Sequence, residues 1–210
     1  MKYLLCAFSL LLASVSYAND NFNEGEHYQT LAVPAADTAK VVEYFSYYCP
    51  FCYNFEPIVA QLKLALPTNA AFHKVPVAFH GGPLAPDVQR AHALAETLNV
   101  AESFSTALFA QIHQQRKPPQ NRDALKQLFA GLGVSNEKFD VNFNSMPINT
   151  LISEYEQAIR DANIRSVPSF IVNDKYLVNI SAVSSQQQFN ALVNYLLTLQ
   201  NETTLAANSD

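Results

Sequence analysis

The order of strand-like and helix-like segments is the feature that most constrains the fold of this chain. Stretches rich in β-branched and aromatic residues occur at 28–33, 40–47, 70–79, 167–172 and 176–178. Apolar residues at helical spacing occur at 50–66, 85–100, 101–115, 123–132, 147–163 and 184–199. Strand segments at both ends of the sequence must meet in one sheet. We therefore predict an α/β fold that is interrupted by an inserted all-helical domain.

Two cysteines stand where the second strand segment gives way to the first helix, in the sequence Cys49-Pro50-Phe51-Cys52. Unpaired N–H groups and the helix dipole stabilise a negative charge at such a position, so we expect a thiolate at Cys49. Pro50 fits a first helical turn because its missing N–H costs nothing there. Cys52 lies nearly one turn further on and is expected to be the less exposed thiol. The pair predicts thiol–disulfide exchange through a mixed disulfide on Cys49.

A zinc site and an inert structural disulfide are the alternatives for this pair. Zinc needs about four nitrogen or sulfur ligands, and His73 and His80 are too far apart to form the usual ligand pair. A disulfide between two such close cysteines closes a small loop and constrains the unfolded chain little. A redox-active pair therefore fits best, with no metal and no cofactor beyond the Cys49–Cys52 disulfide itself.

Residues 1–18 have the pattern of a secretory signal peptide. Lys2 precedes an apolar run from 3 to 15, and the small residues at its end predict cleavage after Ala18. The run is shorter than the about 20 residues that a membrane-spanning helix needs, and a buried N-terminal helix is the alternative. Cys6 would leave with this segment. Export would place the two remaining cysteines where disulfides persist.

The charge balance argues against one class of partner. The chain has 18 acidic residues against 13 Lys and Arg, a net charge of −5, whereas nucleic-acid binding relies on clustered cations. We therefore expect no nucleic-acid partner. Nothing in the sequence demands more than a monomer. The polar segment 201–210 is expected to be a disordered tail.

Residues 42–56, which surround the cysteine pair, closely resemble the active-site region of the DsbA family of periplasmic thiol:disulfide oxidoreductases. The similarity continues at Lys74, at the turn 79–82 and at 164–176. It therefore spans nearly the whole chain after residue 18.

The resemblance implies a thioredoxin-like fold that is built from 19–79 and 156–200 and carries the helical insertion at 80–155. It also implies a cis peptide bond before Pro168, in a loop opposite the cysteines. Spacing alone does not predict such a bond, because only about one X–Pro bond in twenty is cis.

The resemblance also implies roles for individual residues. Cys49 is similar to the family's nucleophile and Cys52 to its partner, while Val167 and Pro168 match the loop that receives substrate main chain. The charged residues found near the buried cysteine in this family are matched by Glu43, Glu56 and Lys74.

A Glu43–Lys74 pair that assists proton movement at Cys52 is our hypothesis for these charges. Both residues stand among apolar neighbours in strand segments, and burial of either without a partner is costly. The alternative is that one or both point outward to solvent. Glu56 is interpreted as a surface residue of the helix.

The dipeptide Pro50-Phe51 departs from the family pattern, which is most often Pro-His. A histidine at this position stabilises the nucleophilic thiolate by charge and hydrogen bonding, and phenylalanine does neither. We expect an oxidant whose strength the sequence leaves open. The dipeptide also resembles that of DsbL, a specialised relative with a narrower role.

The activity that this resemblance implies is the oxidation of reduced, unfolded exported proteins in the periplasm. A membrane partner resembling DsbB would reoxidise the cysteine pair and pass the electrons to quinone. The alternatives are a DsbL-like oxidase, a disulfide isomerase or reductase, a redox-independent chaperone with an apolar groove near Pro168, and a glutathione-dependent transferase. Val167 argues against an isomerase, because such relatives usually carry threonine before the cis-proline.

Overall fold

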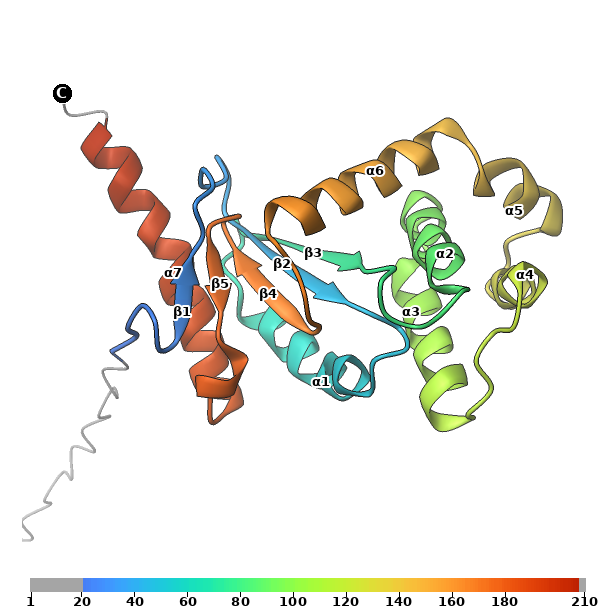
Figure 1. Ribbon diagram of the computed structural model, residues 1–210, viewed down its shortest axis with the longest axis horizontal. Coiled ribbons are helices and arrows are strands. Elements are labelled where there is room, and N and C mark those ends of the chain that lie inside the picture. Colours follow the sequence, from blue (N-terminus) through green and yellow to red (C-terminus); the bar gives the residue numbers. More distant parts are fainter. Residues whose placement is uncertain (1–20, 208–210) are drawn as a thin grey trace, which may run out of the picture.

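A five-stranded sheet forms the centre of the molecule (Figure 1). The computed structural model describes residues 21–207, so the signal-peptide and cleavage predictions lie outside the described residues. The strand order is β1-β5-β4-β2-β3; β2 and β3 are parallel and the other neighbours are antiparallel. The strands are β1 (Tyr28–Thr30), β2 (Lys40–Phe45), β3 (Ala71–Pro76), β4 (Ser169–Val172) and β5 (Tyr176–Val178). Segments from both ends of the sequence thus share one sheet, as predicted.

Two helices, α1 (Pro50–Ala65) and α7 (Gln186–Ala207), cover one face of this sheet (Figure 1). Side chains alternate between the two faces of a strand, so every second residue of β2 and β4 packs toward these helices. The resulting apolar core contains Val41, Val59, Leu62, Phe170, Val172, Leu192, Val193 and Leu196. It anchors α1, and with it the cysteine pair at the start of α1, to the sheet.

The remaining helices form the insertion, which lies beyond one end of the sheet (Figure 1). They are α2 (Ala85–Thr97), α3 (Ala101–Phe109) with a π-helical continuation η1 (Ala110–Gln114), α4 (Arg122–Gly131), α5 (Asn136–Phe143) and α6 (Met146–Asp161). Their shared core contains the aromatic side chains Phe104, Phe129, Phe139 and Phe143, whose rings contact one another in sequence order. Helix α6 leads the chain back to the other face of the sheet, and a short 3-10 turn η2 (Ile180–Ala182) precedes α7.

The structure differs from the sequence-based expectations at two helices. Helix α5 was not predicted, because its short segment shows little apolar periodicity; it begins where the Ser135 hydroxyl accepts a hydrogen bond from the Lys138 N–H. Helix α7 continues to Ala207, into the segment 201–210 that was expected to be a disordered tail. No glycine or proline interrupts that stretch, so its polar composition alone did not end the helix. No helix between residues 21 and 207 is long and apolar enough to cross a membrane.

Candidate active site

Cys49 is the N-cap residue of α1, directly after the short connection that follows β2. Its backbone is extended, with φ −86° and ψ 115°, and its Sγ accepts a hydrogen bond from the Cys52 N–H at 3.3 Å. Pro50 occupies the first helical turn, as the sequence predicted. An N-cap sulfur therefore replaces the usual side-chain oxygen at the positive end of the helix dipole, where a thiolate is stabilised.

Both cysteines are free thiols and both are buried. The exposed fraction is 3% for Cys49 and 0% for Cys52, so Cys52 is the less exposed thiol but Cys49 is also largely covered. Burial raises the pKa of the Cys52 thiol far above its usual value, and the neighbouring Cys49 and Glu43 add to this rise. A thiolate released at Cys52 therefore takes up a proton readily.

A distant loop lies against the nucleophile position. The Val167–Pro168 peptide bond is cis, as the family resemblance implied. The Val167 carbonyl oxygen lies 3.6 Å from Cys49 Sγ and accepts a weak hydrogen bond from the thiol. The loop that precedes β4 thus borders the cysteine pair, although more than a hundred residues separate the two segments in sequence.

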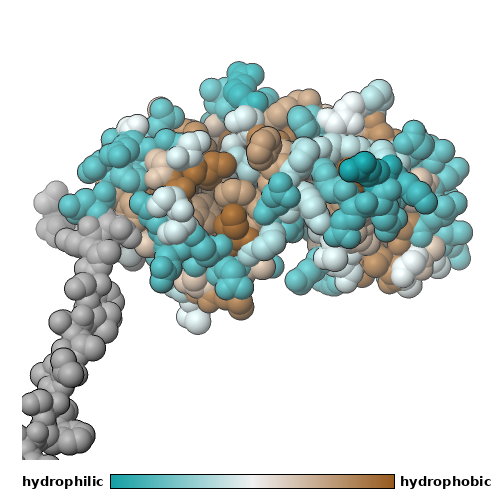
Figure 2. Space-filling view, turned by 90° about the horizontal axis from the view of Figure 1, so that it is seen from below, coloured by the Kyte–Doolittle hydropathy of each residue, from teal (hydrophilic) through white to brown (hydrophobic). Residues whose placement is uncertain are grey.

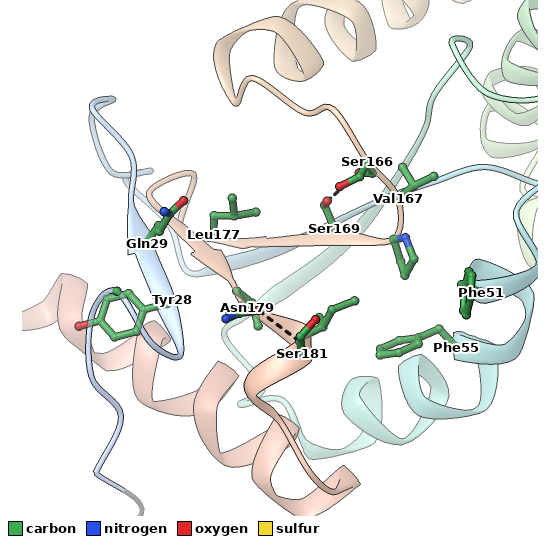
Figure 3. A pocket seen from close by; sticks show the side chains of 14 residues that line it. Tyr28, Gln29, Phe51, Phe55, Ser166, Val167, Ser169, Leu177, Asn179 and Ser181 are labelled. Carbon is green, nitrogen blue, oxygen red and sulfur yellow. Dashed lines mark hydrogen bonds between the residues drawn. The ribbon is translucent and has the colours of Figure 1, made fainter.

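A groove of about 520 Å³ runs from this loop along the edge of the sheet (Figure 3). Phe51 and Phe55 of α1 form one end, with Phe51 72% exposed. The rest of its lining comes from β1, the cis-proline loop and the segment from β5 to η2, and includes Gln29, Ser166, Val167, Pro168, Leu177, Asn179 and Ser181. The face seen from below carries apolar residues over the half of the molecule that holds the sheet (Figure 2). The groove therefore combines the exposed ring of Phe51 and the partly buried ring of Phe55 with hydroxyl and amide groups.

Glu43, Lys74 and Glu56 form a charged cluster beneath the site. Glu43 of β2 and Lys74 of β3 are paired in the parallel register, so their side chains lie on the same face of the sheet. Lys74 Nζ lies 3.1 Å from Glu43 Oε2 and also forms an ion pair with Glu56 of α1. The interpretation of Glu56 as a simple surface residue is therefore wrong: α1 packs over this part of the sheet and brings its carboxylate to Lys74.

The environment of this cluster raises the pKa values of both strand residues, Glu43 and Lys74, with different consequences for their charge. Glu43 is fully buried, and neither of its carboxylate oxygens receives a hydrogen bond from residues 21–207. Burial raises its pKa from 4.5 to about 7, although the charge of Lys74 acts in the opposite direction. Burial lowers the pKa of Lys74, but the attraction of Glu43 and Glu56 outweighs it and leaves that pKa raised. Glu43 therefore gains and loses its proton near neutral pH while Lys74 stays charged.

Comparison with known proteins assigns the family. Residues 59–196 match the family model of the DsbA-like thioredoxin domain. The thiol:disulfide interchange protein DsbA of Escherichia coli K12 is 30% identical over 205 residues, which cover 93% of this chain and 98% of that protein. The chain belongs to the DsbA-like thioredoxin family. It is a thiol:disulfide oxidoreductase.

Solved DsbA structures share its fold. A cysteine-to-serine variant of DsbA from Proteus mirabilis, in complex with a non-covalently bound peptide, superimposes with a TM-score of 0.79 at 30% identity; the match covers 85% of this chain and 99% of that one. DsbA from Pseudomonas aeruginosa gives a TM-score of 0.76 at 28% identity, over 91% of this chain and 99% of that one. The thioredoxin-like fold with a helical insertion is thereby confirmed for this DsbA-like protein.

Sequence reasoning missed the residues that fasten the active-site end of β2 to the helical insertion. The Tyr47 hydroxyl contacts His92 Nδ1 at 2.6 Å and Ser105 Oγ at 2.7 Å, and all three side chains are buried. His113 Nε2 lies 2.8 Å from the Tyr47 carbonyl oxygen, and its ring stacks on Tyr53. The partners come from α2, α3 and η1, so no spacing within one segment signals them.

The turn after β3 is also fixed to the active-site connection of this DsbA-like protein. The Ser46 hydroxyl donates to the His80 carbonyl oxygen at 3.0 Å. Gly81 has a φ of +123°, and a Cβ at this position would lie 2.1 Å from Cδ2 of Tyr48. Only glycine allows the turn to approach the Tyr48 ring so closely, next to Cys49 in the sequence. Within residues 21–207, no three His, Cys, Asp or Glu side chains gather as a metal site.

Proposed function

We propose that this protein is a disulfide oxidase that introduces disulfide bonds into exported proteins through Cys49 and Cys52. The observation that carries the proposal is the placement of Cys49 Sγ, which caps α1 through the Cys52 N–H and faces the Val167 carbonyl beside the cis-proline. This position favours the thiolate and hence the reduced pair, and a pair whose reduced form is stabilised oxidises other thiols.

The exchange proceeds in two steps. A thiolate of the substrate attacks Cys49 Sγ in the Cys49–Cys52 disulfide, a mixed disulfide forms, and the electron pair of the broken S–S bond leaves on Cys52. A second substrate thiolate then attacks the substrate sulfur of the mixed disulfide and releases Cys49. The substrate loses two electrons and gains a disulfide, and the enzyme pair is reduced to two thiols.

Glu43, Lys74 and Glu56 assist the first step by supplying a proton to the Cys52 thiolate. Cys52 leaves as a thiolate in a buried environment that raises its pKa strongly, so it must be protonated quickly. Glu43 has a pKa of about 7 and can therefore give up a proton at neutral pH. Lys74 then stabilises the carboxylate that remains, and Glu56 holds the Lys74 ammonium in place.

The loop at Val167 and Pro168 receives the main chain of the substrate, and the neighbouring groove receives its side chains. The rings of Phe51 and Phe55 in this groove suit apolar side chains, and its hydroxyl and amide groups suit main-chain polar groups. Such a combination accepts many unfolded sequences rather than one. A solved relative, DsbA from Proteus mirabilis, carries a non-covalently bound peptide, which agrees with peptide binding in this family.

The periplasm is the proposed location, supported by the signal-peptide pattern of residues 1–18 and cleavage after Ala18. The reduced pair needs an acceptor for its two electrons after each turnover. We assign that role to a membrane protein resembling DsbB that delivers them to quinone.

The test uses a reduced, unfolded protein with two cysteines and an equimolar amount of the oxidised enzyme. The substrate is expected to gain one disulfide while the enzyme loses one, as followed by acid quenching and mass spectrometry. Cys49→Ser should abolish this transfer. Reduced Cys52→Ser, mixed instead with the disulfide form of the same substrate, should accumulate a mixed disulfide on Cys49, because the enzyme has no second thiol to resolve it. Prevention of aggregation that is unchanged in Cys49→Ser, without any thiol oxidation by the wild type, would support the chaperone alternative. Faster rescue of a scrambled protein than oxidation of a reduced one would support the isomerase.

A further inference from the structure

A π-helical turn brings the end of α3 to the cysteine pair. Helix α3 continues directly into η1, where the Gln115 N–H donates to the Ala110 carbonyl five residues earlier. Because its hydrogen bonds join residues five apart, a π-helix has more than four residues per turn, and such turns are frequent at functional sites. The side chains of Phe109 and His113 therefore face the same way, and both rings contact Tyr53 of α1, at centroid distances of 5.9 Å and 4.9 Å.

Contacts from η1 hold the chain on both sides of the cysteine pair. On one side, His113 Nε2 lies 2.8 Å from the carbonyl oxygen of Tyr47. A carbonyl oxygen only accepts, so this nitrogen carries the hydrogen and donates it. On the other side, Gln114 Nε2 donates to the Tyr53 hydroxyl at 2.6 Å, and the His113 ring is stacked on the Tyr53 ring with an interplanar angle of 10°. Tyr47 and Tyr53 stand on either side of the cysteine pair in the sequence, so the two sets of contacts enclose it.

The backbone between these contacts carries the hydrogen bonds that shape the start of α1. The Cys49 N–H donates to the Ser46 carbonyl and the Tyr53 N–H donates to the Cys49 carbonyl, both at 3.1 Å. Displacement of Tyr47 or Tyr53 therefore moves the backbone of Cys49 itself. Cys49 Sγ depends on that backbone to reach the Cys52 N–H at 3.3 Å. The contacts of η1 are thus transmitted to the capping sulfur through main-chain atoms.

We propose that His113 and Gln114 are positioning residues, which stabilise the reduced form of the pair by holding Cys49 Sγ at the Cys52 N–H. In the oxidised form, the covalent S–S bond fixes that sulfur whether or not η1 restrains the backbone. In the reduced form, the sulfur is held by two weak contacts, with the Cys52 N–H and with the Val167 carbonyl. Restraint of the backbone therefore stabilises the reduced form more than the oxidised form, which makes the pair more oxidising.

This inference rests on the oxidase activity proposed above, and the two can fail separately. A wild-type pair as reducing as that of thioredoxin would overturn the oxidase. The role of η1 is tested by the ratio of each variant to the wild type, whatever value the wild type itself has. A residue that merely supports the fold stabilises both redox forms alike and leaves that ratio at one.

The experiment measures the equilibrium in which two glutathione thiols reduce the Cys49–Cys52 disulfide and are joined as glutathione disulfide. The equilibrium constant is obtained at pH 7 by acid trapping and alkylation. Loss of one whole hydrogen bond corresponds to about fivefold, so His113→Leu should lower the constant by about twofold to fivefold. His113→Gln keeps an N–H donor, and its constant should stay nearer to the wild type than to His113→Leu.

A second pair of variants provides a matched control. Gln114→Leu removes the donor to Tyr53 and should also lower the constant, whereas Gln115→Leu makes the same change at the next residue, which is equally classed as exposed, and should not.

Urea unfolding of both redox forms gives an independent measurement. His113→Leu should destabilise the reduced form more than the oxidised form, by the amount that the change in the glutathione constant requires. An unchanged constant in His113→Leu and Gln114→Leu, an equal effect of Gln115→Leu, a His113→Gln constant as low as that of His113→Leu, or equal destabilisation of both redox forms would overturn the proposal.

Discussion

Replacement of Glu43 by glutamine gives a pH-dependent change in stability whose sign and size follow from the site. The carboxyl is fully buried and its pKa is raised from 4.5 to about 7. At pH 4 the folded and unfolded chains both carry the proton, so titration of Glu43 contributes no pH dependence there. Between pH 4.5 and pH 7 the unfolded chain loses the proton and the folded chain keeps it. The wild type must therefore lose stability relative to Glu43→Gln over this interval.

The magnitude follows from the difference between the two pKa values. Each tenfold difference in proton affinity corresponds to about 1.4 kcal/mol, so the interval from 4.5 to 7 corresponds to about 3 kcal/mol. Above pH 7 both states are ionised and the difference stays constant. All other titrating groups are common to the two proteins, and their contributions cancel to first order in the comparison.

The assay is urea unfolding of both reduced proteins at one-unit steps from pH 4 to pH 8. Far-ultraviolet circular dichroism is the signal, because the chain has no tryptophan. Lys74→Met provides a second arm: it removes the cation that favours the Glu43 carboxylate, so the decline in stability should continue above pH 7. A pH-independent difference, or a wild type that gains stability with pH relative to Glu43→Gln, would show that Glu43 is an ordinary ion-paired carboxylate and would refute the proton-transfer role.

Three further predictions follow from the geometry. Phe51→His should make the cysteine pair more oxidising, because a cation beside the capping sulfur stabilises the reduced form. The equilibrium constant with glutathione measures this, and each tenfold change in it corresponds to about 30 mV. An unchanged constant would show that the residue at position 51 does not tune the redox potential. Gly81→Ala should lower the free energy of unfolding in urea by about 1–3 kcal/mol, because the new Cβ meets the Tyr48 ring. Adding Tyr48→Ala to this variant should recover part of the loss, and no recovery would exclude the contact with Tyr48 as its cause. Alkylation of the reduced, folded protein, followed by mass spectrometry, should label Cys49 in preference to Cys52, because Cys52 is fully buried and has a raised pKa. Equal labelling of the two cysteines would contradict this prediction.

The fold could be predicted largely from local patterns. The strands and most helices follow the periodicity of their side chains, and the start of α1 follows from Pro50 after an apolar strand. Helix α5 was not predicted because Phe139 and Phe143 are the only buried residues of this short segment. Its burial depends on the neighbouring helices, which the segment itself does not encode.

The site could be predicted where its members are adjacent in sequence. Cys49 and Cys52 are such a case, and the family resemblance added the cis bond before Pro168. The position of Glu56 depends on how α1 is rotated against the sheet, so helical spacing alone misplaced it at the surface. The contacts of Tyr47 with His92 join segments whose proximity arises only when the insertion packs against the sheet.

Equilibration of the Cys49–Cys52 pair with glutathione buffers is the most direct test of a disulfide oxidase. The fraction of reduced enzyme is measured by acid trapping and alkylation at each ratio of thiol to disulfide. The stabilised thiolate at the start of α1 predicts a pair that glutathione reduces far more readily than it reduces thioredoxin. A potential as reducing as that of thioredoxin, about −270 mV, would contradict oxidation of exported proteins as the function of this pair.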